Sequence, residues 1–446
     1  MLPDLNRFRG SAGRVHLIGC AGVGTLPLAR ILLARGFRVS GSDLLDTEEL
    51  RRLRAAGAMI FSGPHRKENL PPDDGSELLV IHTSAAGADN PELSEALRRG
   101  AAVLRRGSAL AALTSLYRRT VSVSGSHGKT SVTGMLSFLF EDAGLKPGFL
   151  IGGFLSGWGG RNGSAGAGDD IFVTEADESD GTHAEIRSHI GIVTNFEDDH
   201  AWSLGGVKVL KRNFSTYAAQ ARTLVYVGGP ATDELFADHP DKCRIDPDLA
   251  HHAAELAMFD PAALKRWGAY QKINAVTALT AAELLGMKPQ LAAEILSRFP
   301  GVERRMSVRL DNGRYLLIED YAHHPTELRE CLAALRELHP GRRLAVIFQP
   351  HRYARLERYF DDFVRELKKC DAVFIAPVFA AWTASGKYDS ADLAAAVGKN
   401  ACAPAGSWDG MAESVAASLR PGDTVAVIGA GDVKDIIPPL KELLSR

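Results

Sequence analysis

The chain has 446 residues, which at the usual size of roughly 100–200 residues per domain predicts two to four domains. Its 54 acidic and 52 basic side chains nearly balance, so the formal charge of −2 produces no overall field that would attract nucleic acid or an anionic membrane. We therefore expect small molecules as partners.

The cysteines and the apolar runs indicate the compartment. The five cysteines form no C-x-x-C pair, which fits free thiols better than disulfides or zinc. The N-terminus lacks the apolar core of a signal peptide, and no apolar run reaches the roughly 18 residues of a membrane span. We expect a soluble cytoplasmic protein.

The first 116 residues have the pattern that begins a nucleotide-binding βαβ unit. Residues 14–18 predict a strand, GCAGVG a glycine turn, residues 26–35 a helix, and FRVSGSD a second strand with Asp43 at its tip. Further strands are expected at LLVIHTSAA and AAVLRR, with the helix PELSEALRRG between them. The glycines do not have the dinucleotide spacing, so NAD is a weak candidate and a tight turn without a ligand is the alternative; they are Gly19, Gly22 and Gly24.

A second glycine loop lies in the stretch VSVSGSHGKTSVT, residues 121–133. An alternating apolar run stops at Gly125, Lys129 is followed by hydroxyls at Thr130 and Ser131, and a helix-compatible segment comes next. Glycines let backbone N–H groups approach a phosphate, a lysine reaches the β and γ oxygens, and a threonine hydroxyl can bind Mg²⁺. The pattern predicts a shortened phosphate loop for ATP, because Val123 stands where the general pattern has a further glycine. A glycine turn with a surface lysine is the alternative.

Acidic residues follow two predicted strands after this loop. Residues 170–174 lead into EADESD, and residues 190–194 lead into NFEDDH. Carboxylates so close together repel unless cations or solvent compensate, and a P-loop fold places its magnesium-binding acid just past a strand. The two strand ends favour a magnesium site, with a solvated acidic turn and a structural histidine as alternatives. The residues concerned are Glu175, Asp177, Glu178, Asp180, Asn195, Glu197, Asp199 and His200.

The last part of the chain alternates strands and helices from about Arg305 onward. Strands are expected at YLLIEDY, RLAVIFQP, DAVFIAPV and TVAVIGAG, and a single helix is expected over ARLERYFDDFVRELKK. This alternation predicts a parallel, doubly wound sheet, whose ligands bind at the carboxyl ends of the strands. Residues 210–262 carry no clear functional signal, and INAVTALTAAELLGM predicts a helix after them.

The order of seven motifs resembles the Mur ligases of peptidoglycan synthesis: GCAGVG, GSHGKTS, EADESD, TNFEDDH, GVERR, EDYAHHPTE and FQPHRY. The resemblance covers nearly the whole chain and implies an α/β protein of three domains. These are an N-terminal Rossmann-like UDP-binding domain (1–116), a central P-loop ATPase-type domain (117–303) and a C-terminal Rossmann-like domain for the amino acid (304–446). It also implies ATP and Mg²⁺ as cofactors, and the ATP-dependent addition of L-alanine to UDP-N-acetylmuramate through an acyl phosphate. The expected state is a monomer or homodimer.

The resemblance gives expected roles to residues at matching positions. The nucleotide would be bound by Gly125, Ser126, His127, Gly128, Lys129, Thr130, Ser131, Asn274, Arg305 and Asp320, and the magnesium ions by Thr130, Glu175 and His200. The two other substrates would be bound by Gly22, Gly24, Asp43, His65, Arg106, Asn195, Tyr321, His323, His351, Arg352 and Arg355. The catalytic set implied is Lys129, Glu175, His200, Arg305 and Asp320.

The sequence departs from the family pattern near the adenine motif and after the third strand of the last domain. Tyr270 and Gln271 stand where the family has a histidine and an asparagine, and AAWTASG replaces a segment with a glycine and a glutamate. Three alternatives therefore stay open: a related ligase that attaches a tripeptide, which FQPHRY argues against; a nucleotide-binding protein without turnover; and an NAD-dependent oxidoreductase, which would leave Lys129 and the acidic strand ends unexplained.

Overall fold

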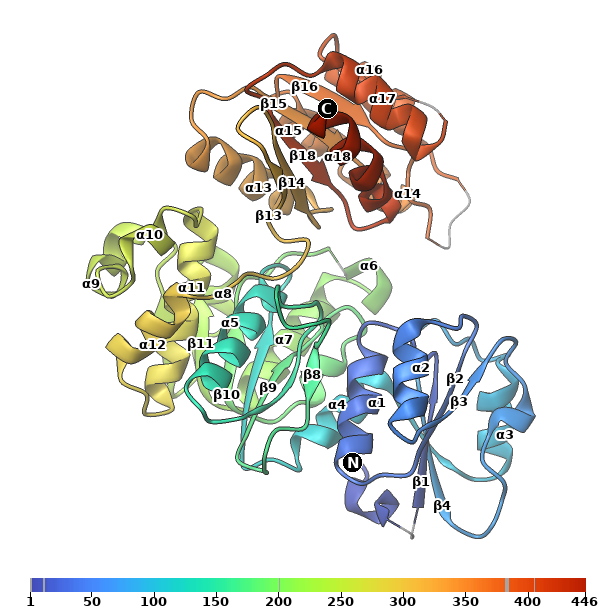
Figure 1. The fold of residues 1–446 in the computed structure, drawn as a ribbon. Helices are drawn as coiled ribbons and strands as arrows, with labels where there is room; N and C mark the ends of the chain where they lie inside the picture. Colours follow the sequence, from blue (N-terminus) through green and yellow to red (C-terminus); the bar gives the residue numbers. More distant parts are fainter. Residues whose placement is uncertain (1, 11–12, 200, 382–384, 405) are drawn as a thin grey trace. The chain divides into compact units, whose positions relative to one another are not determined.

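The computed structural model describes residues 2–10, 13–199, 201–381, 385–404 and 406–446. The chain forms two compact units, and the helices and strands of both are shown in Figure 1. The first unit comprises Met1–Asp260 and Ile273–Pro300, and the second comprises Pro261–Lys272 and Gly301–Arg446. Two sheets belong to the first unit and one to the second, which confirms the expected α/β class with parallel sheets. The expected limits of the three domains stay a prediction.

The first sheet is wholly parallel. Its elements, in chain order after η1 (Leu5–Phe8), are β1 (Gly13–Ile18), α1 (Thr25–Ala34), β2 (Val39–Asp43), α2 (Glu48–Ala55), β3 (Met59–Ser62), η3 (Lys67–Asn69), β4 (Glu77–His82), α3 (Pro91–Arg98), β5 (Ala102–Arg105) and α4 (Arg106–Thr114). The strand order is β3-β2-β1-β4-β5. Helices α1, α2 and α4 pack on one face and α3 on the other (Figure 1), so the central strands β1 and β2 are buried along most of their length. The order reverses at β1, where open α/β sheets bind ligands.

The second sheet has the order β12-β11-β10-β6-β9-β7-β8, and only β8 is antiparallel to its neighbour. The elements are β6 (Arg119–Ser124), α5 (Lys129–Asp142), β7 (Gly148–Leu150), β8 (Gly163–Ser164), β9 (Ile171–Glu175), η4 (Thr182–Glu185), β10 (Ser188–Val193), α6 (Ala201–Leu204), α7 (Val207–Ala219), β11 (Ala221–Val227), α8 (Pro230–Leu235) and β12 (Lys242–Ile245). The segments η5 (Leu249–His252), α9 (Ala253–Leu256), α10 (Pro261–Leu264), α11 (Ala269–Leu284) and α12 (Pro289–Ser297) follow. Because β9 and β10 flank β6, the ends of all three strands meet at the predicted phosphate loop.

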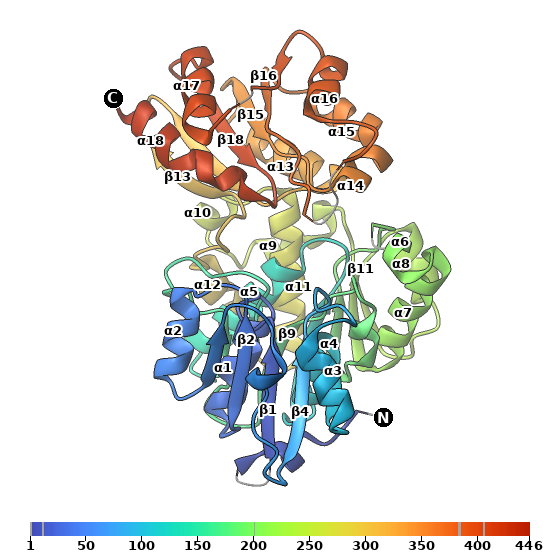
Figure 2. The same cartoon turned by 90° about the vertical axis from the view of Figure 1, so that its right-hand side faces the viewer.

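The third sheet forms the centre of the second unit, with the order β13-β14-β18-β15-β16-β17. The elements are β13 (Ser307–Asp311), β14 (Leu316–Asp320), α13 (Pro325–Leu338), β15 (Leu344–Phe348), α14 (Tyr353–Arg358), α15 (Phe360–Leu367), β16 (Ala372–Ile375), α16 (Ser390–Val397), β17 (Ala401–Cys402), α17 (Trp408–Ser418), β18 (Thr424–Ile428), η6 (Asp432–Ile436) and α18 (Ile437–Ser445). Figure 2 shows α17 and α18 on one face and α13 to α16 on the other, over two separate apolar cores.

Two details of this sheet differ from expectation. The edge strand β13 pairs antiparallel with β14, so the sheet is not wholly parallel. The single helix expected over residues 354–369 is also wrong, because the chain breaks between α14 and α15 at Tyr359, where φ is −115° and ψ is 24°. The Tyr359 ring lies edge-on to the His324 ring, with centroids 4.6 Å apart. In the described part of the chain, no helix has both the length and the apolar character needed to cross a membrane.

Candidate functional site

The loop between β6 and α5 has the geometry of a phosphate cradle. Gly125 and Gly128 have φ values of +131° and +83°, in the left-handed region that favours glycine. A Cβ at Gly125 would lie 2.2 Å from Thr194 Oγ1, so the end of β10 leaves room only for a glycine. Gly128 is the residue before α5, and the helix N-terminus therefore faces the loop.

Lys129 is held inside the site. Its side chain is 12% exposed, and Nζ donates to Gly125 O at 2.7 Å and lies 2.8 Å from the buried carboxylate of Glu178. Burial opposes the charge, but Glu178, Asp177 and Glu175 raise the pKa of Lys129 above its usual value. The alternative of a surface lysine beside a glycine turn therefore does not apply.

Two oxygen atoms at the loop suit a magnesium ion. Thr130 Oγ1 lies 3.0 Å from Glu175 Oε2, at the end of β9, and Gly152 N donates to the same oxygen at 3.0 Å. Adjacent ligands of an octahedral Mg²⁺, each about 2.1 Å from the metal, are about 3 Å apart. The pair thus fits the cation predicted there. His200, the third predicted ligand, lies outside the described residues.

Other predicted residues support the loop from neighbouring strands and helices. Asn195, after β10, accepts from His127 N at 2.8 Å and donates to His127 O at 3.1 Å, so it fixes the loop backbone. Ser126 Oγ accepts from Glu197 N at 2.8 Å. Asn274 on α11 is 6% exposed, and its Oδ1 lies 3.3 Å from where a Cβ on Gly128 would be. Ser131 is half-buried in the first turn of α5.

The first glycine turn is closed by Asp43. The Asp43 carboxylate accepts from Ala21 N at 2.8 Å and from Leu45 N at 3.1 Å. Gly22 N donates to Gly19 O at 3.3 Å within this turn. A Cβ at Gly24 would lie 3.0 Å from Arg106 Nη1, so the glycine lets the guanidinium approach the turn.

Residue types alone did not predict the partners of the acidic segment after β9. Lys129 pairs with Glu178, and Arg106 Nη2 lies 3.5 Å from Asp177 Oδ2. The positively charged side chains that offset these carboxylates therefore come from two helices. Lys129 begins α5, directly after the phosphate loop, and Arg106 begins α4, beside the first glycine turn. No sequence spacing could have shown this pairing, because it joins segments up to 71 positions apart.

In the second unit, two predicted residues, Arg305 and Tyr321, lie near the buried carboxylate of Asp320 at the end of β14. Asp320 is 4% exposed and accepts from Met306 N and Ala322 N, each at 2.8 Å. Burial raises the pKa of Asp320 to about 6, although Arg305 opposes the shift. The Arg305 guanidinium lies 5.1 Å from the centre of the Tyr321 ring. Burial lowers the pKa of Arg305, but the carboxylates of Glu327 and Asp320 outweigh this effect and raise the pKa above its usual value.

The end of β15 brings a second predicted group to the same edge of this sheet. The His323 and His351 rings lie with centroids 5.5 Å apart, and Arg355 Nη1 lies 3.1 Å from His351 Nδ1. Arg352 has a φ of +70°, and its N–H donates to Phe379 O at 2.8 Å. The structure thus places Tyr321 and His323 after the carboxyl end of β14, His351 and Arg352 after that of β15, and Arg355 in the first turn of the following helix, α14.

Two family models match this chain. The model described as "Mur ligase family, catalytic domain" matches residues 14–118, and the one described as "Mur ligase, glutamate ligase domain" matches residues 304–431. The chain is 34% identical to the UDP-N-acetylmuramate–L-alanine ligase of Synechococcus sp. (strain JA-2-3B'a(2-13)), over 95% of this chain and 90% of that protein. It is 33% identical to the ligase of the same name from Thermobifida fusca, over 97% of each.

Solved structures support the same fold. The UDP-N-acetylmuramate-alanine ligase of Thermotoga maritima has a TM-score of 0.76 at 23% identity and covers 97% of this chain and 99% of its own. A murein peptide ligase from Psychrobacter arcticus has a TM-score of 0.64 at 20% identity, with the same coverage. The curated relatives match nearly from end to end at about one-third identity, across both compact units. This chain belongs to the Mur ligase family.

Proposed function

We propose that this protein is an ATP-dependent ligase that joins L-alanine to the lactyl carboxylate of UDP-N-acetylmuramate, a step in peptidoglycan precursor synthesis. One observation carries the proposal: the loop that ends β6 holds Lys129 beside the Thr130–Glu175 oxygen pair. The near full-length similarity to ligases of that name supports the choice of substrates. An NAD-dependent oxidoreductase would leave the buried Lys129 and the Thr130–Glu175 oxygen pair without a role.

The reaction needs activation because a carboxylate is a poor acyl donor. In the first step a carboxylate oxygen bonds to the γ-phosphorus of ATP, the bond to the β-phosphate oxygen breaks, and ADP leaves. In the second step the neutral amine of L-alanine attacks the acyl carbon, phosphate leaves with the C–O bonding electrons, and the amine loses a proton. The protein's contribution is to position the anions and offset their repulsion.

We assign these tasks to the residues of the first unit as follows. Lys129 neutralises the β and γ phosphate oxygens, and the glycine loop donates its backbone N–H groups. Thr130, Glu175 and His200 would hold Mg²⁺, which supplies further positive charge at the phosphates when bound. Gly22, Gly24, Asp43, His65 and Arg106 bind the UDP portion, with Asn195 bracing the phosphate loop from the end of β10.

The second unit is proposed to bring the amino acid. Arg305 and Asp320 lie next to each other at the end of β14, where they would contact the nucleotide. Arg352 and Arg355 suit the α-carboxylate of L-alanine, because a guanidinium binds a carboxylate through two parallel hydrogen bonds. Tyr321, His323 and His351 complete this edge of the sheet.

We further propose a cytoplasmic enzyme that acts as a monomer or homodimer. The five cysteines are free thiols, which fits a reducing compartment. Size-exclusion chromatography with light scattering determines the mass directly, and one or two 47.9 kDa chains are expected.

The test measures ADP release with UDP-N-acetylmuramate while the amine is varied, in the unaltered protein and in Lys129→Ala. We expect release that depends on L-alanine and is lost in the variant. Release that requires a tripeptide would instead identify a peptide-attaching ligase, and no release with any amine would indicate a nucleotide-binding protein. Circular dichroism of Lys129→Ala shows whether it folds.

A further inference from the structure

A buried polar network underlies the carboxyl edge of the first sheet. Glu92, on α3, is fully buried and accepts four hydrogen bonds. Its Oε2 lies 2.8 Å from His16 Nε2 and 2.6 Å from Ser42 Oγ, and its Oε1 lies 2.9 Å from His65 Nδ1 and 2.8 Å from Asn69 Nδ2. The donors come from β1, β2, η3 and the loop after β3, so one carboxylate links α3 to four other segments around this sheet.

The donor count shows that the nitrogen of each histidine that faces Glu92 carries hydrogen. A carboxylate offers two acceptor positions on each oxygen, and the four donors fill them. Burial raises the pKa of Glu92, but the hydrogen bonds from His16, Ser42 and Asn69 outweigh it and bring the pKa to about 2, so the group is ionised near neutrality. A histidine nitrogen that faces this acceptor must carry hydrogen. His16 is therefore protonated on Nε2, and its Nδ1 lies 2.9 Å from Ser40 Oγ.

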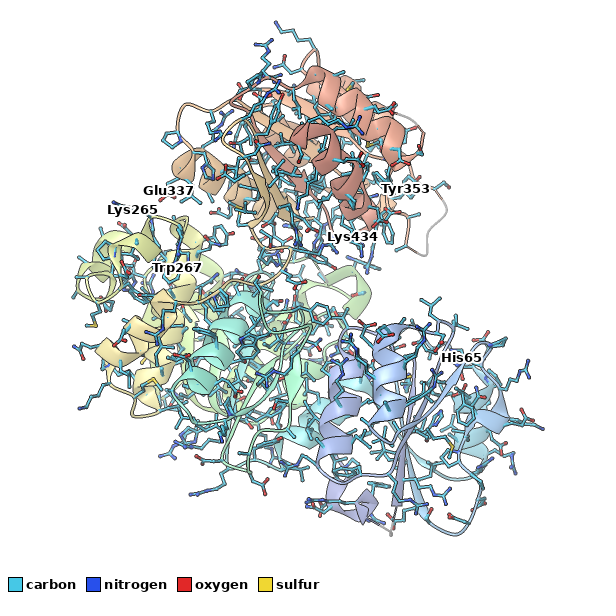
Figure 3. All side chains as sticks on the ribbon, in the orientation of Figure 1. His65, Lys265, Trp267, Glu337, Tyr353 and Lys434 are labelled. Carbon is cyan, nitrogen blue, oxygen red and sulfur yellow. The ribbon has the colours of Figure 1, made fainter. Side chains whose placement is uncertain are left out.

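His65 differs from His16 in its exposure. The His16 side chain is fully buried, whereas the His65 side chain is 20% exposed. His65 follows β3 and lies at the carboxyl end of the first sheet, as Figure 3 shows. Its Nδ1 points to Glu92 and Ser42, and its Nε2 has no hydrogen-bond partner among the described residues. In the neutral ring with hydrogen on Nδ1, this second nitrogen is an acceptor available to a ligand.

We propose that Glu92 is a positioning residue that holds His65 in the Nδ1–H form, so that His65 Nε2 accepts a hydrogen bond from the uridine portion of the UDP-sugar. The donors that uridine offers are the uracil imide N–H and the ribose hydroxyls. The diphosphate offers only acceptors, so His65 does not bind it. This inference rests on the proposed function for the identity of the ligand, but the tautomer of His65 does not depend on it.

The tautomer is tested in the full-length protein labelled with ¹⁵N-histidine, by two-bond ¹H–¹⁵N correlation NMR without ligand. We expect His65 to show hydrogen on Nδ1 only, in the unaltered protein. In Glu92→Gln a side-chain amide can donate to Nδ1, so we expect the hydrogen to move to Nε2. Glu68→Gln is the matched control, because Glu68 is 67% exposed on the neighbouring η3. An Nε2–H ring or a doubly protonated ring in the unaltered protein would overturn the proposal, and this measurement needs no variant to fold.

The ligand contact is tested by titrating uridine and UDP into the unaltered protein and His65→Phe. If the donor lies on uridine, the variant weakens both ligands by the same factor, which we expect to be roughly tenfold or more. A loss confined to UDP would place the contact on the diphosphate and refute the assignment.

In Glu92→Gln the KM for the UDP-sugar should rise while the KM for ATP stays constant, whereas an equal rise in both would indicate only a structural role. If neither uridine nor UDP binds the unaltered protein, the proposed function fails while the NMR result still stands.

Discussion

At the scale of single residues, Lys129 and Glu178 form an ion pair whose loss affects stability and activity by different routes. Removing one member of a buried pair commonly costs about 3–5 kcal/mol. Lys129→Ala should therefore lower the free energy of unfolding by about 3 kcal/mol as well as abolish ADP release. Adding Glu178→Gln should restore most of the stability and none of the turnover.

Urea unfolding and ADP release measure these two effects separately. Lys211→Ala is the control, because its ammonium is 3.5 Å from Glu234 in a largely exposed pair and should change neither quantity. If the double variant regained turnover, Lys129 would have no direct role at the phosphates.

His183 predicts a pH dependence of stability. It is 1% exposed, packs against the Phe214 and Tyr217 rings, and has no hydrogen-bond partner for either ring nitrogen among the described residues. Burial lowers its pKa from 6.5 to about 4. Between these two pKa values His183 is protonated in the unfolded chain and neutral in the folded chain. The free energy of unfolding therefore falls as the pH drops from 6.5 toward 4.

When the pH falls from 7 to 5, His183 should lower the free energy of unfolding by about 2 kcal/mol. Over the same pH range the free energy of unfolding of His183→Leu should fall by about 2 kcal/mol less than that of the unaltered protein. Urea unfolding at both pH values measures this difference. His251→Leu, with a side chain 65% exposed in the unaltered protein, should keep the original pH dependence. A His183→Leu protein with an unchanged pH dependence would show that the ring is already charged when folded.

Arg352 offers a test of the amino-acid site. Its backbone is fixed by the hydrogen bond to Phe379 O, so Arg352→Ala should leave the loop in place and remove only the guanidinium. We expect the KM for L-alanine to rise roughly tenfold or more, with the KM for ATP changed less than about twofold. Arg358→Ala, on the exposed side of α14, is the control. A larger effect on ATP would remove Arg352 from the proposed role.

Residue types predicted some parts of the site and not others. Gly125, Lys129 and Thr130 lie close in sequence, so their spacing alone indicated a phosphate loop, and the strand end at Glu175 could be placed beside it. The Glu92 network joins residues up to 76 positions apart, and nothing local distinguishes Glu92 from an ordinary helix-starting acid. Such partners become visible only when the strand order is known.

At the scale of elements, α4 and η4 pack so closely that one glycine is required between them. A Cβ on Gly107, in the first turn of α4, would lie 1.7 Å from Thr182 Oγ1. Gly107→Ala should therefore lower the free energy of unfolding by about 1–3 kcal/mol, because backbone or side chains must shift. The shift would also displace Arg106 and raise the KM for the UDP-sugar.

Gly410→Ala in α17 is the matched control, since the nearest atom to its added Cβ is Ser407 Oγ at 3.7 Å. This substitution should stabilise the protein by about 0.5–1 kcal/mol through helix propensity. Thermal unfolding compares the two variants. Equal effects at both sites would mean that the α4–η4 contact relaxes without cost.

Most strands and helices could be predicted because their apolar periods are strong, whereas strand order could not. The last strand, β18, enters the third sheet between β14 and β15, although its sequence resembles any other buried strand. The interruption at Tyr359 was missed for a related reason. Leu356, Phe363 and Leu367 keep the helical spacing on both sides of it, and the Tyr359 ring at the break contacts His324, which is distant in the sequence.

At the scale of the whole molecule, the chain enters the second unit twice. Residues 261–272 belong to it, the chain then returns to the first unit for residues 273–300, and it re-enters at residue 301. The first unit nevertheless contains both glycine loops, with Lys129, Thr130, Glu175 and Asn274 at one and Asp43, His65 and Arg106 at the other. Only Arg305 and Asp320, of the residues proposed to bind the nucleotide, belong to the second unit.

This division predicts the behaviour of a chain that ends at Pro300. Because all proposed UDP contacts lie in the first unit, its Kd for UDP should stay within about threefold of the full-length value. Its Kd for ADP should rise roughly tenfold or more, since Arg305 and Asp320 are missing, and L-alanine-dependent ADP release should be absent. Isothermal titration calorimetry with each nucleotide measures both constants, and circular dichroism establishes that the shortened chain is folded. A folded chain that bound ADP normally but had lost UDP would contradict the assignment of the two glycine loops.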